Sequence, residues 1–163
     1  MISKHFRFPV LLLSLYLCLF VIACSDEPDS AEQQIRQLIT QAEQRAEQRE
    51  ISGLKELISE NYQDDRGLDQ KGILRLALVY FMGHSNIHLF THIKEIHLTG
   101  PEQAHVKLFA AMTGTVVNSM NEFFNIRAQL YLFELSLIKE DAEWQVNQAS
   151  WRRAQINEML NDQ

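Results

Sequence analysis

Cysteine is almost absent from this 163-residue chain: only Cys18 and Cys24 occur, and both lie close to the N-terminus. The chain beyond Cys24 can therefore form no disulfide, and it offers no thiol for nucleophilic catalysis or for binding soft metals. Internal repeats and low-complexity segments are also missing. Stability must come from a hydrophobic core, and the residues after Cys24 are numerous enough to build one in a single domain.

Positive charge is scarce as well, with 15 basic against 21 acidic residues. Lys4 and Arg7 are the only Lys, Arg, Asp or Glu residues in the segment 1–23, so its removal would leave 13 basic and 21 acidic residues, a net charge of −8. An acidic surface argues against binding nucleic acid and against electrostatic adhesion to anionic lipid.

The N-terminal segment has the pattern of a secretory signal. Two basic residues precede a run of about 16 residues, from Phe8 to Ala23, that carries no Lys, Arg, Asp or Glu. A membrane-spanning helix needs roughly 20 apolar residues, so this run is short for a span. We therefore exclude residues 1–23 from the folded domain.

The end of this run, Val21-Ile22-Ala23-Cys24, resembles the bacterial lipobox. The resemblance implies cleavage before Cys24 and acylation of its sulfur and amino group, which supplies the several acyl chains that stable anchoring requires. Ser25, rather than Asp, follows the cysteine, and by the same resemblance this favours the outer over the inner membrane, with the protein facing the periplasm. An uncleaved anchor and ordinary signal cleavage are the alternatives. In either case Cys24 would be a plain apolar residue like Cys18.

Helical patterns occupy the first half of the remaining chain. Residues 24–30 are polar and acidic and predict a tether, and Ser30 with Gln33 forms a capping box before an amphipathic helix that continues to about Glu50. Gly53 is expected to interrupt the chain before a short second helix. Asp69 can cap a third helix that runs to about Met82. The side of this helix that is expected to face the core carries Ile73, Leu74, Ala77, Leu78 and Phe81.

Strand patterns follow Gly83. Segments 106–117, 124–138 and 143–151 are rich in β-branched or alternating apolar residues and are separated by turn signals at 99–102 and 139–141. Helices followed by long antiparallel strands predict the α+β class, with the N-terminal helices packed on a strongly curved antiparallel sheet.

The order of these elements is similar to that of the nuclear transport factor 2-like superfamily, the cystatin-like or SnoaL-like cone, and within it to lipid-anchored bacterial members. The resemblance covers residues 31–155 and leaves 156–163 as a C-terminal tail. It is carried by dispersed positions, namely Tyr62, Asp65 to Gly67, Tyr80-Phe81, Ile96, Ala104, Val106, Trp144 to Val146 and Ala149 to Trp151. No residue set that defines an enzyme can be matched position by position.

In this superfamily the cone commonly encloses an apolar pocket, which implies a candidate pocket formed by Tyr62, Tyr80, His88, Met112, Tyr131, Phe133 and Trp151. Such a pocket would bind a small apolar ligand, without catalysis and without a cofactor. The alternatives are an envelope protein as partner, or isomerase- or dehydratase-like acid/base chemistry. Glu134 is the one acid in an apolar strand and could serve as a base if it is buried, but an outward position is expected.

Four of the six histidines lie between residues 84 and 97. On a helix, His84, His88 and His92 would share one face and could bind a metal. On a strand, His88 and His92 lie about 13 Å apart, too far for a single zinc ion. The flanking turn at Gly100 and the β-branched residues favour a strand, so we expect no metal site.

A hairpin across Gly100 predicts a specific register. Apolar matching pairs Ile96 with Val106 and Leu98 with Ala104, and it therefore places Glu95 opposite Lys107 and His97 opposite His105. Two protonated imidazoles at opposed positions would repel, which predicts a slight loss of stability below about pH 6.

Two further clusters are weaker candidates. Asp64, Asp65 and Asp69 lack the spacing of a calcium-binding loop, and turn formation and helix capping account for them. Arg127 and Gln129 precede Tyr131, Phe133, Leu135 and Leu137 on one strand face, which we interpret as a homodimer interface or another partner surface.

Overall fold

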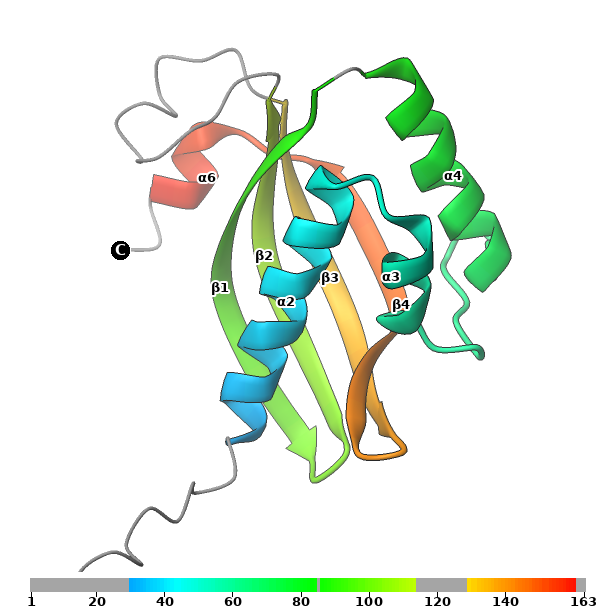
Figure 1. Ribbon diagram of the computed structural model, residues 1–163. Coiled ribbons are helices and arrows are strands. Elements are labelled where there is room, and N and C mark those ends of the chain that lie inside the picture. Colours follow the sequence, from blue (N-terminus) through cyan, green and yellow to red (C-terminus); the bar gives the residue numbers. More distant parts are fainter. Residues whose placement is uncertain (1–29, 85, 114–128, 161–163) are drawn as a thin grey trace, which may run out of the picture. The chain divides into compact units, whose positions relative to one another are not determined.

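The computed structural model describes residues 30–84, 86–113 and 129–160, and Ala31–Gln163 forms one compact unit. Three helices precede four strands and a last short helix (Figure 1). The elements are α2 (Ala31–Glu47), α3 (Ile51–Glu56), α4 (Gln70–Gly83), β1 (His88–Gly100), β2 (Gln103–Thr113), β3 (Gln129–Glu140), β4 (Glu143–Arg153) and α6 (Ile156–Leu160). The predicted α+β order is confirmed, and the predicted strand residues 114–117 and 124–128 lie outside the described part.

The strands form one antiparallel, curved sheet in the order β1-β2-β3-β4, with α2 and α3 on one face (Figure 1). The register predicted across Gly100 is confirmed: the observed pairs are Glu95 with Lys107, Ile96 with Val106, His97 with His105 and Leu98 with Ala104. Matching the apolar residues was sufficient here because a shift of one residue would turn every apolar side chain of β1 to the other face.

Three register shifts interrupt the pairing: one lies beside the turn, between Leu98 and Gly100, and two lie within the strands. Ile93 pairs with Leu108 and Glu95 with Lys107, which leaves Lys94 unmatched in β1. Likewise the pairing of β3 with β4 shifts in the middle, and Asn147 has no register partner there. A bulge bends a strand and increases its local twist, so these two positions help to curve the sheet around the helices.

The main core lies between the helices and the sheet. Ile35, Leu38 and Ile39 of α2 are buried against sheet residues that include Val106 and Leu137. Because side chains alternate along a strand, Phe109 and Leu130 lie on the opposite, outer face. There Met159 of α6, which is 2% exposed, packs with them, so the segment expected as a tail contains a packed helix.

Other parts of the chain contact both edges of the sheet. At β1, the Leu89 backbone N–H donates to Glu47 and the Thr91 hydroxyl donates to Glu43, both on α2. At β4, the segment after α3 pairs with the edge through backbone hydrogen bonds between Leu57 and Val146, Ser59 and Val146, and Gln63 and Asn147, each between 2.9 and 3.1 Å.

The break between the first two helices was expected at Gly53, and this prediction is wrong. The break falls at Arg49, whose φ of 58° turns the chain after α2, and Gly53 lies inside α3. A Cβ at Gly53 would come within 2.6 Å of Cδ of Arg45, so this glycine permits the close approach of two helices rather than a turn.

The third helix begins as predicted, because the Asp69 carboxylate accepts a hydrogen bond of 2.7 Å from the Gly72 N–H. Its orientation differs from the prediction. Leu74 and Phe81 are buried, but Leu78, expected in the core, is 44% exposed. No helix within the described residues is long and apolar enough to cross a membrane.

Candidate functional site

A row of aromatic side chains crosses β3 and β4 on the helix-covered face. Tyr131 and Phe133 lie two residues apart on β3, and Trp151 is paired with Phe133 across the strands. The ring centroids of Tyr131 and Phe133 are 6.4 Å apart, and those of Phe133 and Trp151 are 5.9 Å apart and nearly parallel. All three side chains are only half-buried, so the row leaves apolar surface accessible beside the core.

Arg66 closes one end of this row. Its guanidinium lies 4.1 Å from the ring centroid of Trp151 and also donates to the Trp151 carbonyl oxygen at 3.3 Å. The loop that carries Arg66 is fixed by Asp64, whose Oδ1 accepts hydrogen bonds from the backbone N–H groups of Arg66 and Leu68. A cation over an indole ring is attracted to it, so Arg66 holds the ring in place and offers a donor to a polar group nearby.

Tyr80 approaches the row from α4. Burial, and secondarily the charge of Tyr131, raises the pKa of Tyr80. The Tyr80 ring also stacks on His84, with the centroids 4.1 Å apart. Met112 lies two residues after Ala110 on β2, and Ala110 is paired with Tyr131 of β3. Because side chains alternate along a strand, Met112 lies on the same helix-covered face as these residues.

Five of the seven predicted pocket residues, Tyr80, Met112, Tyr131, Phe133 and Trp151, therefore belong to this one face, and two do not extend it. Tyr62 is 3% exposed and belongs to the packed core, where burial and the nearby Asp64 raise its pKa to about 12. His88 follows the parity of the outer face, and its Nδ1 lies 3.7 Å from Oε1 of Glu47.

The groups needed for proton transfer lie elsewhere among the described residues. Glu134 points outward, as expected, and forms a 3.3 Å ion pair with Lys107. Oδ1 of Asp64 accepts two hydrogen bonds from the backbone of its own loop, and Oδ2 is buried without a hydrogen-bond partner among the described residues. Within the described segments, no three His, Cys, Asp or Glu side chains gather in a way that could hold a metal ion.

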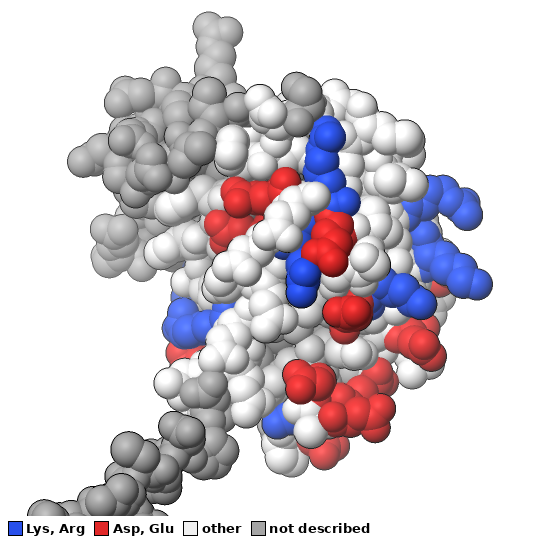
Figure 2. Space-filling view, viewed as in Figure 1, with Lys and Arg blue, Asp and Glu red and all other residues white. Residues whose placement is uncertain are grey.

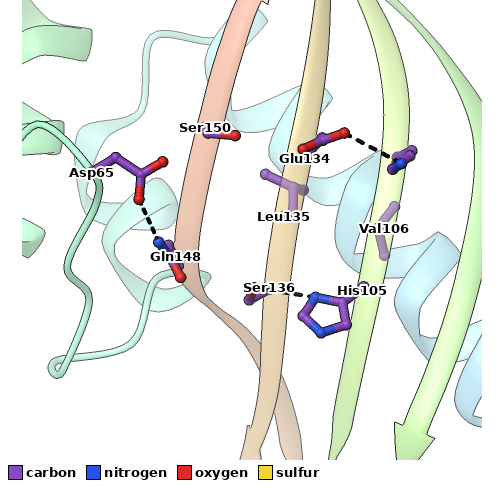
Figure 3. A pocket seen from close by; sticks show the side chains of 9 residues that line it. Asp65, His105, Val106, Glu134, Leu135, Ser136, Gln148 and Ser150 are labelled. Atoms are coloured by element: carbon purple, nitrogen blue, oxygen red, sulfur yellow. Dashed lines mark hydrogen bonds and ion pairs between the residues drawn. The ribbon is translucent and has the colours of Figure 1, made fainter.

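A depression of about 280 Å³ lies away from the aromatic row, on the outer face of the sheet (Figure 3). It is polar: Nδ1 of His105 lies 3.3 Å from Oγ of Ser136, and Gln148 donates to Asp65 at 2.8 Å. A neighbouring hollow of about 210 Å³ is lined by Glu95, His97, His105 and Lys107. Sequence reasoning identified the opposed histidines but missed the depression, although polar residues at every second position of β3 and β4 marked it.

The surface expected to form a homodimer is largely core. Leu135 and Leu137 are buried against the helices, and Gln129 accepts a 2.9 Å hydrogen bond from the Tyr131 hydroxyl. Arg127 lies outside the described residues. If copies associate through the sheet, its outer face is the surface that remains for this contact.

No protein-family model matches the sequence, and no curated protein sequence matches it either. Solved structures do match its fold. The "Putative Scytalone Dehydratase" of Novosphingobium aromaticivorans superposes with a TM-score of 0.63 at 10% identity, covering 76% of this chain and 84% of that one. An NTF-2 like protein of unknown function from Shewanella oneidensis superposes with a TM-score of 0.56 at 15% identity, covering 75% and 98%.

Bd1075 of Bdellovibrio bacteriovorus matches with a TM-score of 0.59 at 12% identity, over 76% of this chain but only 41% of that longer one. The fold is therefore the nuclear transport factor 2-like, cystatin-like cone, as the sequence resemblance implied. At these identities the similarity establishes the fold and leaves the activity to be argued from the residues of this chain.

Proposed function

We propose that this protein is a lipid-anchored, periplasm-facing binding module that holds a small apolar ligand without chemically changing it. The observation that supports the binding role is the half-buried aromatic row of Tyr131, Phe133 and Trp151, which Tyr80 and Arg66 approach from outside the sheet. Ligand sites are typically apolar and aromatic surfaces with few, well-placed polar groups. The anchor is Cys24, followed by the tether 25–30.

The geometry favours a flat, largely apolar ligand. Rings about 6 Å apart on one strand face present adjoining π surfaces on which a planar molecule can stack. Arg66 and the phenol of Tyr80 can each donate one hydrogen bond at the edge of such a ligand, and the Tyr131 oxygen, whose proton is donated to Gln129, can accept one. The outer depression is polar and lined by paired charges, so it suits this ligand less well.

Binding can be measured with the neutral fluorophore N-phenyl-1-naphthylamine, using energy transfer from tryptophan. The chain contains two tryptophans, of which Trp144 is buried in the core and Trp151 belongs to the row. Wild-type protein should bind the probe saturably, and Trp151→Leu should bind it at least several-fold more weakly by probe fluorescence. The matched control is Leu98→Ser, an exposed apolar residue at the far end of β1. Equal affinities for all three proteins would reject the site.

The anchor is tested separately by metabolic labelling with a fatty-acid analogue. Wild type and Cys18→Ala should be labelled, since Cys18 would be removed with the signal, and Cys24→Ala should not be. Unlabelled wild-type protein would reject lipidation. Separation of the inner and outer membranes then shows which of them holds the labelled protein, and the outer membrane is the expected location. Mass spectrometry of co-purifying molecules distinguishes an apolar ligand from an envelope protein.

One observation favours a second candidate, an isomerase- or dehydratase-like enzyme. The half-buried phenol of Tyr80, whose pKa is raised by burial and secondarily by Tyr131, can donate a hydrogen bond that polarises a substrate carbonyl. The Novosphingobium protein of the same fold carries the name of a dehydratase. Dehydration of small cyclic hydroxyketones, followed by absorbance, would show it; activity that survives Tyr80→Phe and Tyr131→Phe together would remove these residues from the chemistry.

A further inference from the structure

The outward face of α4 is apolar and exposed where a soluble helix is normally polar. Leu78, Val79 and Met82 are 44%, 56% and 72% exposed. Lys71 and Arg75 share this face, because residues 71, 75, 78 and 82 follow one another at helical intervals of three or four. The opposite side of the helix carries the buried Leu74 and Phe81 and the half-buried Tyr80.

The charge of α4 is the reverse of that of the whole chain. Between Gln70 and Gly83 there are two basic residues and no acidic one, whereas the chain has 15 basic and 21 acidic residues. Basic side chains project from the side of the molecule that carries α4 (Figure 2). The net negative charge opposes adhesion to anionic lipid over most of the surface, so α4 is a place where attraction can replace repulsion.

From these two features we propose that α4 docks on the lipid bilayer, with Leu78, Val79 and Met82 entering the acyl boundary and Lys71 and Arg75 contacting anionic headgroups. A helix with apolar side chains and flanking basic residues on one face is suited to this position. A second copy packed with its α4 parallel to this one is disfavoured as the occupant, because that contact would bring two Lys71–Arg75 pairs together.

This inference rests on the proposed lipid anchor. Residues 24–30, fully extended, reach at most about 25 Å. The tether would therefore hold the domain beside the bilayer at all times, so a weak helix–lipid contact would suffice. Since Tyr80 lies on the inner side of the same helix, docking would place the aromatic row next to the lipid phase, where apolar ligands are concentrated.

The test uses the lipidated protein in vesicles of phosphatidylethanolamine and phosphatidylglycerol. Once the signal is removed and Cys24 is acylated, Met82→Cys carries the only free thiol, which is labelled with the environment-sensitive dye NBD. NBD at this position should shift to shorter wavelength and gain intensity when vesicles are added. NBD on Glu102→Cys, in the exposed turn between β1 and β2, should keep its emission in water.

Flotation of the vesicles, scored in the same samples, separates the two proposals. Protein that does not float has no anchor and contradicts the proposed function. Protein that floats, but whose Met82→Cys label remains in water, overturns docking of α4 while leaving the anchor intact. An emission change that depends on the density of protein in the vesicle, and not on lipid, would instead identify a second copy as the occupant and overturn the bilayer proposal.

A charge variant gives an independent check. Lys71→Gln and Arg75→Gln should each reduce the ratio of docked to undocked helix about fivefold in anionic vesicles, the factor that corresponds to about 1 kcal/mol per basic residue at an anionic surface. Neither substitution should change docking on phosphatidylcholine alone. Equal docking of both variants and the parent on anionic vesicles would refute the role assigned to the basic residues.

Discussion

The strongest prediction about stability concerns Tyr62, and it applies at alkaline pH. This phenol is 3% exposed, and burial followed by the Asp64 charge raises its pKa from 10.0 to about 12. In the unfolded chain Tyr62 loses its proton near pH 10, whereas the folded protein retains the proton until about pH 12. The folded state therefore loses stability as the pH rises from 10 to 12 and is unaffected by this residue below pH 10.

The magnitude follows from the pKa difference. One pKa unit corresponds to about 1.36 kcal/mol, so the free energy of unfolding should fall by about 3 kcal/mol between pH 10 and pH 12 because of Tyr62 alone. A domain of this size is stable by about 5–15 kcal/mol, so a loss of that size is easily measured.

The assay is urea unfolding of wild type and Tyr62→Phe at a series of pH values from about 8 to 11.5, followed by circular dichroism. Other alkaline titrations affect both proteins alike, so the difference between the two curves isolates Tyr62. The stability of wild type should fall towards that of the variant, or below it, as the pH increases. Curves that run parallel over the whole range would show that the Tyr62 phenol ionises as easily in the folded protein as in the unfolded one.

Three further predictions follow from packing, capping and charge. Ile35→Ala should cost about 2–5 kcal/mol by denaturant unfolding, whereas Leu76→Ala, at an exposed position of α4, should cost less than about 1 kcal/mol; similar costs would contradict the assigned core. Asp69→Ala should cost about 1 kcal/mol, since it removes the N-cap of α4, and Asp69→Asn should restore most of it. The hydrogen bond from Arg152 lowers the pKa of Glu158 from 4.5 to about 2. The hydrogen-exchange protection of α6 should therefore be complete above pH 4.5 and decline progressively as the pH falls from 4.5 to 2, and Glu158→Gln should abolish this dependence.

The hairpin of β1 and β2 could be predicted residue by residue because its signals are local. Apolar side chains at Ile96 and Leu98 have to match those at Val106 and Ala104, and the turn at Gly100 fixes the distance between them. The three helices before the sheet, the order of helices and strands and the cap at Asp69 were predicted for the same reason, whereas α6 lies where a tail was expected.

The bulge at Lys94 explains why the face of His88 could not be predicted. Counting back from Ile96 in steps of two assigns His88 to the helix-covered face. The extra residue reverses that parity, so Leu89, Thr91 and Ile93 face the helices instead. Since a bulge depends on long-range curvature, no local signal in the sequence reveals it.

The orientation of α4 was equally hidden. Its residues are apolar on nearly all sides, from Ile73 to Met82, so the helical period does not choose a buried face. Packing against the rest of the domain decided that Leu74 would be buried and Leu78 exposed. The aromatic row could be anticipated only from the resemblance, because Trp151 and Phe133 meet through strand pairing rather than sequence proximity.

The contacts at the two edges of the sheet affect how readily this protein can aggregate. An unpaired edge strand is a template on which another chain can add a strand, and such addition leads to aggregation. Here the carboxylates of Glu43 and Glu47 take up donors at the β1 edge, and the segment from Leu57 to Gln63 takes up backbone groups at the β4 edge. These contacts leave fewer backbone groups at the two edges available to pair with a strand of another chain.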